Sequence, residues 1–163
     1  MTPEAIERLK ASYASVTATP RQLAAGFYQE LFAVAPGLRR LFPGDLTNLQ
    51  GHFEAALALV VRNLDEVEAL RPALRDLGAQ HVHWGARPGD YLVARDALIA
   101  ALRGGYPQWD GALEADWRRA ITDIVIPMLQ GAAVETALAA EKLALENAEN
   151  VGDGLQAVPR GTT

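Results

Sequence analysis

Apolar positions recur every three or four residues along most of the chain, which is the spacing of residues on one face of an α-helix. The clearest stripe lies between residues 49 and 64 and consists of Leu49, Phe53, Ala56, Leu57, Val60 and Leu64. No pair of alternating β-rich runs is joined by a short Asn-Gly or Asp-Gly turn, which would have indicated hairpins. We therefore predict an all-α protein.

Proline, glycine and hydroxyl residues predict where the helices begin and end. Thr2-Pro3 and Thr19-Pro20 place a capping hydroxyl before a proline, so helices should begin near residues 3 and 20. The second helix should end before Pro36-Gly37, and a short helical turn should then close at Pro43-Gly44. The apolar stripe of the second helix consists of Leu23, Phe27, Leu31 and Val34. A further helix should carry Leu74, Leu77 and His81 and end at Gly85 and Pro88. Two more helices are expected over Tyr91–Leu102 and Leu113–Gln130, the second with a kink at Pro127.

The C-terminal stretch Val134–Asn150 is rich in Ala, Leu and Glu and should form a helix of its own that stops at Gly152-Asp153-Gly154. Val134, Leu138 and Leu145 give it only a narrow apolar stripe, so it should dock on its own core or on a second subunit. We expect residues 1–131 to form one core domain. Residues 132–163 should form an extension whose last dozen residues are frayed.

Composition narrows the classes of function. The chain has 163 residues, with 15 Lys and Arg against 20 Asp and Glu and a net charge of −5, which argues against a nucleic-acid partner. It has no cysteine, so any metal or redox chemistry must use His, carboxylates or a bound cofactor. The longest uninterrupted aliphatic run, Ala55–Val61, is far shorter than the roughly 20 residues that cross a bilayer. No secretory leader is recognisable, and we expect a cytoplasmic protein without a membrane partner.

The histidines are His52, His81 and His83. His81 and His83 point about 200° apart on a helix, so they cannot hold one metal ion from the same face. His81 continues the stripe of Leu74 and Leu77, where a neutral imidazole could present one nitrogen to a metal while the other bonds the preceding helical turn. A histidine satisfied within the core is the alternative interpretation.

Two motifs together carry a family resemblance. The first consists of Phe27-Tyr28, Leu31-Phe32, Pro36, Leu38 and Leu41-Phe42, and the second of Leu77-Gly78, His81, Gly85, Pro88 and Tyr91. In this order they resemble bacterial single-domain globins and the haem domain of flavohaemoglobins, from about residue 5 to residue 131. The resemblance implies a three-over-three helical sandwich around haem b.

The same resemblance assigns roles to individual residues. His81 is the proximal ligand of the haem iron, with Leu77 beside it, and Phe42 is the aromatic that stacks on the porphyrin. Tyr28 falls where relatives carry a distal tyrosine that donates a hydrogen bond to bound oxygen, although its hydroxyl could instead satisfy a neighbouring carbonyl. Arg87 is expected either to pair with a haem propionate or to stay solvated.

On the distal side this sequence departs from the family. Counting back from Asn63-Leu64-Asp65 puts Leu49 where relatives place Gln or His, and Phe53 lies one turn further on. A register shifted by one residue would bring Gln50 and Glu54 into the pocket instead, which the cost of burying a charge disfavours. His52 could edge the pocket, hold a propionate, act as a second axial ligand or lie in solvent.

Tyr91 matches a tyrosine that flavohaemoglobins keep near the proximal histidine, in a network with a glutamate on the last core helix. Ala132 occupies that glutamate's place here, so the network is incomplete unless Glu135 takes it over. Its loss weakens the case for oxygen activation. Trp84 and Trp117 are expected in the core.

The resemblance implies reversible binding of oxygen, and of nitric oxide or carbon monoxide, at a five-coordinate or weakly six-coordinate haem. The first alternative is nitric oxide dioxygenation. The reductase would have to be external, because the sequence has no Gly-rich dinucleotide motif. The second is a gas sensor whose C-terminal helix relays the state of the haem to another protein. A homodimer is compatible with each of these functions.

Overall fold

The described residues 1–155 of the computed structural model are helical and contain no strand, which confirms the all-α prediction. Side chains are described as far as residue 148. The elements are α1 (Pro3–Val16), α2 (Gln22–Val34), the 3-10 helix η1 (Pro36–Leu41), α3 (Thr47–Arg62), the 3-10 helix η2 (Val67–Leu70), α4 (Arg71–His83), α5 (Pro88–Gly105) and α6 (Gly111–Leu155).

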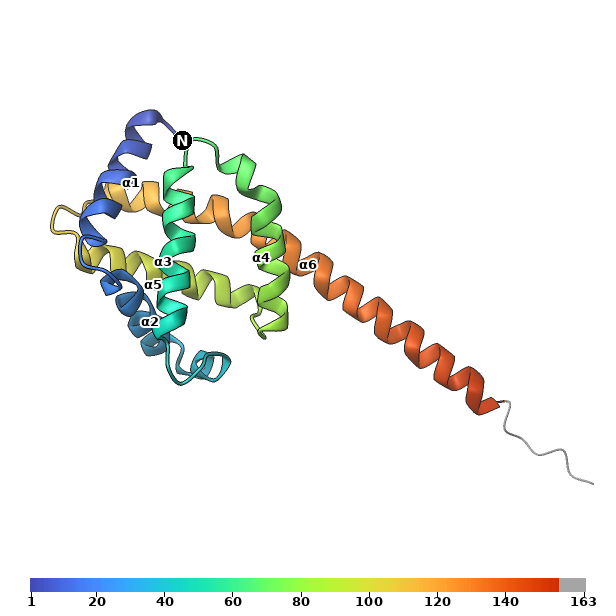
Figure 1. Cartoon of the computed structure of the whole chain (residues 1–163). Helices are drawn as coiled ribbons and strands as arrows, with labels where there is room; N and C mark the ends of the chain where they lie inside the picture. The colour runs from blue at the N-terminus through green and yellow to red at the C-terminus, as the bar shows by residue number, and fades with distance from the viewer. Residues whose placement is uncertain (156–163) are drawn as a thin grey trace, which may run out of the picture.

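The helices form two crossing layers. In Figure 1, α3 (cyan) and α4 (green) run alongside each other, and α5 and the first half of α6 run across them. Helix α2 packs on α5, α1 packs against α3, α5 and α6, and α4 packs mainly on α6. The second half of α6 leaves this body and projects away from it (Figure 1).

The core is held by one large apolar cluster and a smaller one under α4. In the large cluster the buried Trp117 of α6 donates its indole N–H to the Ser12 hydroxyl of α1 at 3.0 Å. Ser12 in turn donates to the Leu9 carbonyl at 3.0 Å, so this buried polar group is satisfied. The smaller cluster contains Leu74, Tyr91 and Met128. The prediction for Trp117 is confirmed, whereas Val34, which we expected on the buried stripe of α2, is 69% exposed.

The two predicted helix starts differ in outcome. Thr2 caps α1 as expected, since its hydroxyl accepts a hydrogen bond from the Ala5 N–H at 3.2 Å. Thr19-Pro20 does not cap α2, which begins at Gln22 after Arg21 adopts the left-handed conformation with φ 65°. The carboxylate of Glu54, on α3, caps this end by accepting from the Arg21 N–H at 3.1 Å and the Ala24 N–H at 3.4 Å.

Helix α4 ends where glycine predicted it would. Gly85 has φ 90°, and the backbone N–H groups of Gly85 and Ala86 bond the carbonyls of Val82 and His81 at 3.0 and 2.9 Å. Trp84 lies at this turn and is 55% exposed, so the expectation that it belongs to the core is wrong. The turn carries the indole past the edge of the buried surface.

Helices α4 and α6 cross with their backbones in direct contact. A Cβ added at Gly78 would lie 1.9 Å from the Met128 carbonyl oxygen, and one added at Gly131 would lie 1.9 Å from the Arg75 carbonyl oxygen. The two glycines therefore permit an approach that no side chain allows. This crossing fixes the position of α4, which carries His81, against α6.

Helix α6 is continuous, so the expected break between Gln130 and Val134 is wrong. Pro127 lies inside the helix without ending it, and Gly131 serves the α4 crossing instead of a helix end. The expected stop at Gly152-Asp153-Gly154 is also wrong, because α6 continues to Leu155. The expectation of fraying falls in part on residues 156–163, which lie outside the described residues. The domain boundary at residue 131 falls within α6 and stays a prediction.

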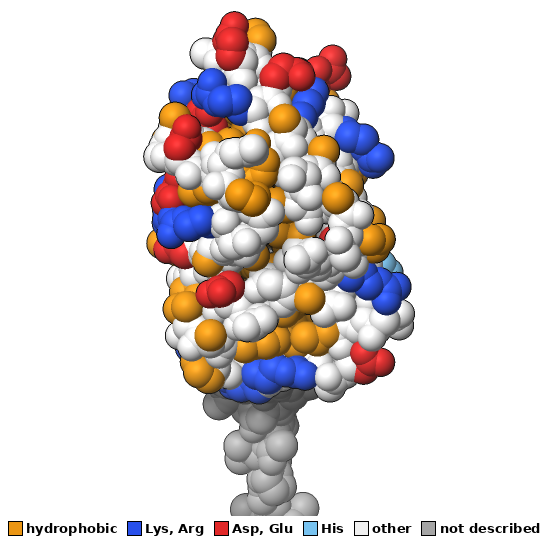
Figure 2. All heavy atoms as spheres, turned by 90° about the vertical axis from the view of Figure 1, so that its left-hand side faces the viewer, with side chains coloured by type: hydrophobic (Ala, Val, Ile, Leu, Met, Phe, Trp, Pro, Cys, Tyr) orange, Lys and Arg blue, Asp and Glu red, His pale blue; other side chains and the backbone are white. Residues whose placement is uncertain are grey.

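The surface of the body mixes charges of both signs with small apolar areas, as Figure 2 shows for the left-hand side of Figure 1. One helix among the described residues is long and apolar enough to cross a membrane, judged by length and composition alone. This is α6 over Gly111–Ala148, with a window of mean hydropathy 1.3 that is 22% buried. Since its first half carries the buried Trp117 and Ile121, that half is a core helix of the body.

Candidate functional site

The imidazole of His81 is oriented by its own helix. Its Nδ1 lies 2.7 Å from the Leu77 carbonyl oxygen one turn earlier. A carbonyl only accepts hydrogen bonds, so Nδ1 carries the proton and the neutral ring keeps a free lone pair on Nε2. Burial lowers the pKa of His81, and the hydrogen bond to Leu77 opposes this in part. Near neutral pH the side chain is therefore a neutral imidazole with one nitrogen available to a metal.

Two aromatic rings flank this imidazole. The Trp84 ring centroid lies 4.9 Å from that of His81, and the buried Tyr91 ring of α5 lies 5.8 Å away. The Tyr91 hydroxyl is sealed from solvent and has no hydrogen-bond partner among the described residues. Burial, followed by the nearby carboxylate of Asp90, raises the pKa of Tyr91, so the phenol keeps its proton.

The proximal network expected of flavohaemoglobins is not completed by Glu135. Its carboxylate lies 3.1 Å from Nε2 of His83, on the outer side of α4, and not at the Tyr91 hydroxyl. Ala132, at the position of the family glutamate, is buried and offers no polar atom. His81 thus keeps only the Leu77 carbonyl as its hydrogen-bond acceptor.

The opposite side of the site is an aromatic cluster built on α2. The Tyr28 ring packs edge-on against Phe42 at 5.7 Å, and Phe42 packs edge-on against Phe32 at 5.2 Å. Burial raises the pKa of Tyr28 to about 12, and no hydrogen bond ties its hydroxyl to another described group. The alternative in which the hydroxyl satisfies a neighbouring carbonyl is therefore not what the structure contains. Tyr28 is a neutral phenol with a proton to donate.

Helix α3 adopts the register that places Leu49 and Phe53 toward this cluster. Both side chains are partly buried against the core, and Phe53 stacks on Phe27 at 4.4 Å with an interplanar angle of 6°. Glu54 is occupied in capping α2, and Gln50 lies one turn before it on the same face of α3. Gln50 is itself half-buried, and its candidate role as a ligand-binding residue stays a prediction.

His52 is exposed on α3. This exposure suits the alternative in which His52 lies in solvent, and its other candidate roles stay predictions. His83 is also exposed and lies beside Glu135, so among the described histidines only His81 combines a half-buried position with a free ring nitrogen. Among the described residues, no three His, Cys, Asp or Glu side chains converge to hold a metal ion, whereas an iron held by a macrocycle needs one protein ligand.

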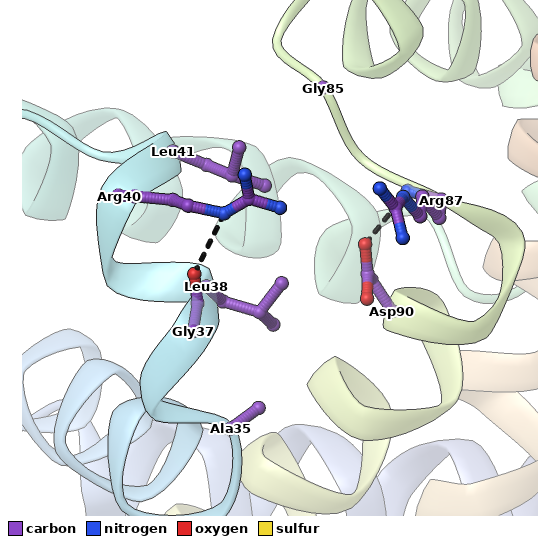
Figure 3. Close-up of a pocket in the computed structure, with 8 residues that line it drawn as sticks. All are labelled: Ala35, Gly37, Leu38, Arg40, Leu41, Gly85, Arg87 and Asp90. Atoms are coloured by element: carbon purple, nitrogen blue, oxygen red, sulfur yellow. Dashed lines mark hydrogen bonds between the residues drawn. The ribbon is translucent and has the colours of Figure 1, made fainter.

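A hollow of about 250 Å³ opens to solvent between η1 and the α4–α5 turn. Figure 3 shows the guanidinium groups of Arg40 and Arg87 reaching toward it from opposite sides. The Arg40 Nε donates to the Gly37 carbonyl at 3.2 Å, and the Arg87 backbone N–H donates to the Asp90 carboxylate at 2.8 Å. Both arginine side chains are exposed, as expected if Arg87 stays solvated. An exposed Arg87 side chain is also accessible to an anion. Arg40 was not identified as a site residue from the sequence, because an arginine next to Arg39 belongs to no motif that would indicate a binding role.

Helices α3 and α4 each carry apolar side chains that are only half-buried. Helix α3 packs on α1 and α2, whereas α4 packs on α6 and η2, so these two neighbouring helices have different packing partners. Leu49 and Phe53 on α3, and Leu77 and His81 on α4, remain partly accessible. A flat apolar group between the helices would cover these side chains.

A sequence profile of the Globin family matches residues 25–128. The chain belongs to the globin family. An engineered carbene transferase from Rhodothermus marinus, whose parent is provisionally assigned as a nitric oxide dioxygenase, superposes with a TM-score of 0.73 at 22% identity, covering 85% of this chain and 99% of that one. A bacterial globin from Campylobacter jejuni superposes with a TM-score of 0.69 at 19% identity, covering 85% and 99%. These likenesses show the globin fold.

A sequence relative is found in rice. The "Anaerobic nitrite reductase NSHB5" of Oryza sativa subsp. indica is 27% identical over 116 residues, which cover 67% of this chain and 80% of that protein. The expected globin fold is confirmed, with the correction that the additional C-terminal helix is the second half of α6.

Haem is the group that the globin family implies, and the residues present fit it. His81 offers a half-buried neutral imidazole with a free Nε2, and Leu77, Leu49, Phe53 and Phe42 offer apolar surface that is not yet covered. Tyr28 supplies a free hydroxyl on the other side of the site. These features match the requirements of a macrocycle with one axial protein ligand.

Proposed function

We propose that this globin binds haem b through Nε2 of His81 and binds oxygen reversibly, with nitric oxide and carbon monoxide as further ligands. The observation that carries the proposal is the 2.7 Å hydrogen bond from Nδ1 of His81 to the Leu77 carbonyl, which leaves Nε2 as the free, neutral ligand atom. Haem, when bound there, would supply an iron that takes a diatomic gas.

Each side of the proposed site has a distinct task. Leu77 holds the imidazole in one orientation, so the ligand atom does not have to be ordered on binding. Phe42 and Phe53 exclude water and cover apolar surface, while Tyr28 holds a proton at its phenol oxygen that it can donate to a polar ligand. Arg87, with Arg40 opposite it, offers positive charge to a carboxylate at the solvent edge.

Absorption spectroscopy of the purified full-length chain tests this proposal. We expect ferric, ferrous and carbon monoxide spectra of a haem b protein with a histidine ligand, and a pyridine haemochrome that identifies haem b. Oxygen should bind reversibly to the ferrous protein. Failure of the full-length chain to take up haem would overturn the proposal.

Nitric oxide dioxygenation with an external reductase is the second candidate. It is supported by the fold shared with the Rhodothermus marinus protein, whose parent carries that provisional assignment. Against it, Tyr91 has no hydrogen-bond partner and Glu135 pairs with His83, so the proximal histidine is not polarised by a carboxylate. Stopped-flow mixing of the oxygenated protein with nitric oxide, followed by re-reduction with a purified flavin reductase, distinguishes a catalyst from a binder. Repeated turnover supports the dioxygenase, and a single turnover supports the binder.

A gas-sensing role is a third proposal, and it is supported by the crossing of α4 and α6. Gly78 and Gly131 hold the helix of His81 backbone to backbone against α6, and α6 continues without interruption beyond the body. A shift of α4 would therefore be carried into the projecting half of α6. A sensor requires self-association that differs between the ferrous and the carbon monoxide forms, and sedimentation of both forms measures it.

A further inference from the structure

The half of α6 that projects from the body carries an uncovered apolar stripe. Val134, Leu138 and Leu145 are 61%, 55% and 62% exposed. At 100° per residue these three side chains lie within about 40° of one another around the helix axis. The core half of α6 is already helical, so the projecting half can continue the same helix without a new nucleation step. The apolar stripe of the projecting half is not buried by this continuation.

This stripe cannot be covered by the chain's own body. The contact of Gly78 and Gly131 with the facing backbones fixes where α6 crosses α4. Just beyond the crossing, Glu135 lies 3.1 Å from His83, and α6 then runs on as one helix. Because the segment leaves the body in a fixed direction, folding back would require breaking α6. This removes one of the two docking sites expected from the sequence.

We propose that residues 135–148 of α6 pair antiparallel with the same segment of a second copy of this chain. A two-fold interface must be complementary to itself, since the same patch is used twice. In an antiparallel pair centred between residues 141 and 142, each Leu138 lies at the level of the other copy's Leu145. Each Glu141 then lies at the level of the other copy's Lys142, so attractive charges meet at the centre.

The stripe has neighbours suited to this pairing. Ala137 and Ala148 border it and let two helices approach closely. Lys142 is 79% exposed and lies 3.9 Å from Glu146 on its own helix, so it remains accessible to a second carboxylate. Three carboxylates and one ammonium group between residues 135 and 146 make the segment a poor occupant of a hydrocarbon layer. A second copy fits this composition better than a lipid bilayer does.

Sedimentation equilibrium of the haem-loaded full-length chain over a wide dilution series tests the interface. We expect the chain to reach twice its 17.5 kDa mass. The double variant Leu138→Glu and Leu145→Glu should raise the dimer Kd by about 100-fold or more. Leu143→Glu is the matched control, because Leu143 is 57% exposed on the opposite side of α6 and should leave the Kd unchanged.

The charge pairing has its own test. Glu141→Lys should raise the Kd by placing two lysines at the same level, and adding Lys142→Glu should restore it by exchanging the two charges. The chain has no cysteine, so single spin labels can be attached at Ala133→Cys or Ala140→Cys. An antiparallel pair separates the two labels at residue 133 by about 20 Å more along the axis than those at residue 140, whereas a parallel pair gives equal separations.

The outcomes that overturn the proposal are specific. They are a monomer at every concentration, a dimer that Leu143→Glu disrupts as much as the double variant does, equal label separations, or flotation of the chain with phosphatidylglycerol vesicles that the double variant abolishes. The last result would assign the stripe to a membrane surface. Retained heme spectra in each variant show that the body is folded.

Discussion

One hydrogen bond distinguishes His81 from the other described histidines. Because the Leu77 carbonyl takes the Nδ1 proton of His81, the free nitrogen of this ring is Nε2. His83, two residues later, is exposed and paired with Glu135. The two side chains point to different sides of α4, as helix geometry predicts for alternate residues.

Replacing these histidines should separate their roles. We expect His81→Ala to abolish stable haem binding or to leave the iron without its imidazole, because no other described histidine is buried with a free nitrogen. His83→Ala should leave the haem spectra nearly unchanged, since it removes only an exposed ring and its contact with Glu135. Absorption spectra of both variants check this. Normal spectra for His81→Ala together with haem loss for His83→Ala would contradict the assignment.

Tyr28 should be the main hydrogen-bond donor to a bound gas, because Leu49 and Phe53 have no proton to donate. A hydrogen bond to a charged acceptor contributes about 1.5 to 3 kcal/mol, so Tyr28→Phe should raise the oxygen dissociation rate about tenfold or more. Laser photolysis or stopped-flow displacement by carbon monoxide measures the rate. An unchanged rate would show that another group supplies the bond.

Tyr28 should also affect stability at high pH. Its pKa is raised to about 12 in the folded protein, whereas an unfolded tyrosine has a pKa of about 10. Below pH 10 both states keep the proton, and the contribution to stability is constant. Above that pH unfolding releases a proton, so the contribution falls as the pH rises toward 12. Urea unfolding of wild type and Tyr28→Phe should show a stability difference that changes above pH 10 and is flat from pH 7 to 9.

At the scale of the elements, glycine has opposite consequences in different helices. Gly78 lies in the α4–α6 crossing, where a Cβ would meet the Met128 carbonyl oxygen at 1.9 Å, and backbone cannot yield as a flexible side chain does. Gly51 lies within α3 with nothing within 4 Å of an added Cβ. The same substitution at these positions isolates the contribution of the close helix approach.

Gly78→Ala should lower the free energy of unfolding by about 2 to 4 kcal/mol and weaken haem retention, because α4 must move away from α6. Gly51→Ala should be neutral or stabilise by up to about 1 kcal/mol, as alanine favours helix over glycine. Urea denaturation followed by circular dichroism measures both. Equal effects of the two substitutions would contradict the importance of the crossing.

At the scale of the whole molecule, α6 joins a core helix and an exposed helix in one element. Truncation after Ala133 removes the stripe of Val134, Leu138 and Leu145 and keeps Trp117, Met128 and Gly131. Such a chain should retain the haem spectrum and the oxygen affinity but remain monomeric. Loss of haem, or a change in oxygen affinity of more than about tenfold, would show that the domain boundary at residue 131 is wrong.

Local sequence determined the positions of most helices and the orientation of the His81 ring. Apolar spacing indicated the helices because a helix must turn one face to the core, and Gly85 ended α4 because it adopts a positive φ at little cost. The stripe through Leu74, Leu77 and His81 also placed the imidazole within reach of its own helical turn. These features depend on residues a few positions apart, so the sequence carries them directly.

Contacts between distant residues decided the rest. Glu54 on α3 caps α2, which begins after Pro20. The carboxylate of Glu135 contacts His83 and not Tyr91. Taken alone, Gly131 indicated the end of a helix. In the structure it lies within α6, where its lack of a side chain allows the Arg75 backbone to approach closely. Local preferences set where a helix can end or a charge can lie. Only the tertiary structure selects among those options, because the deciding partner lies dozens of residues away in the chain.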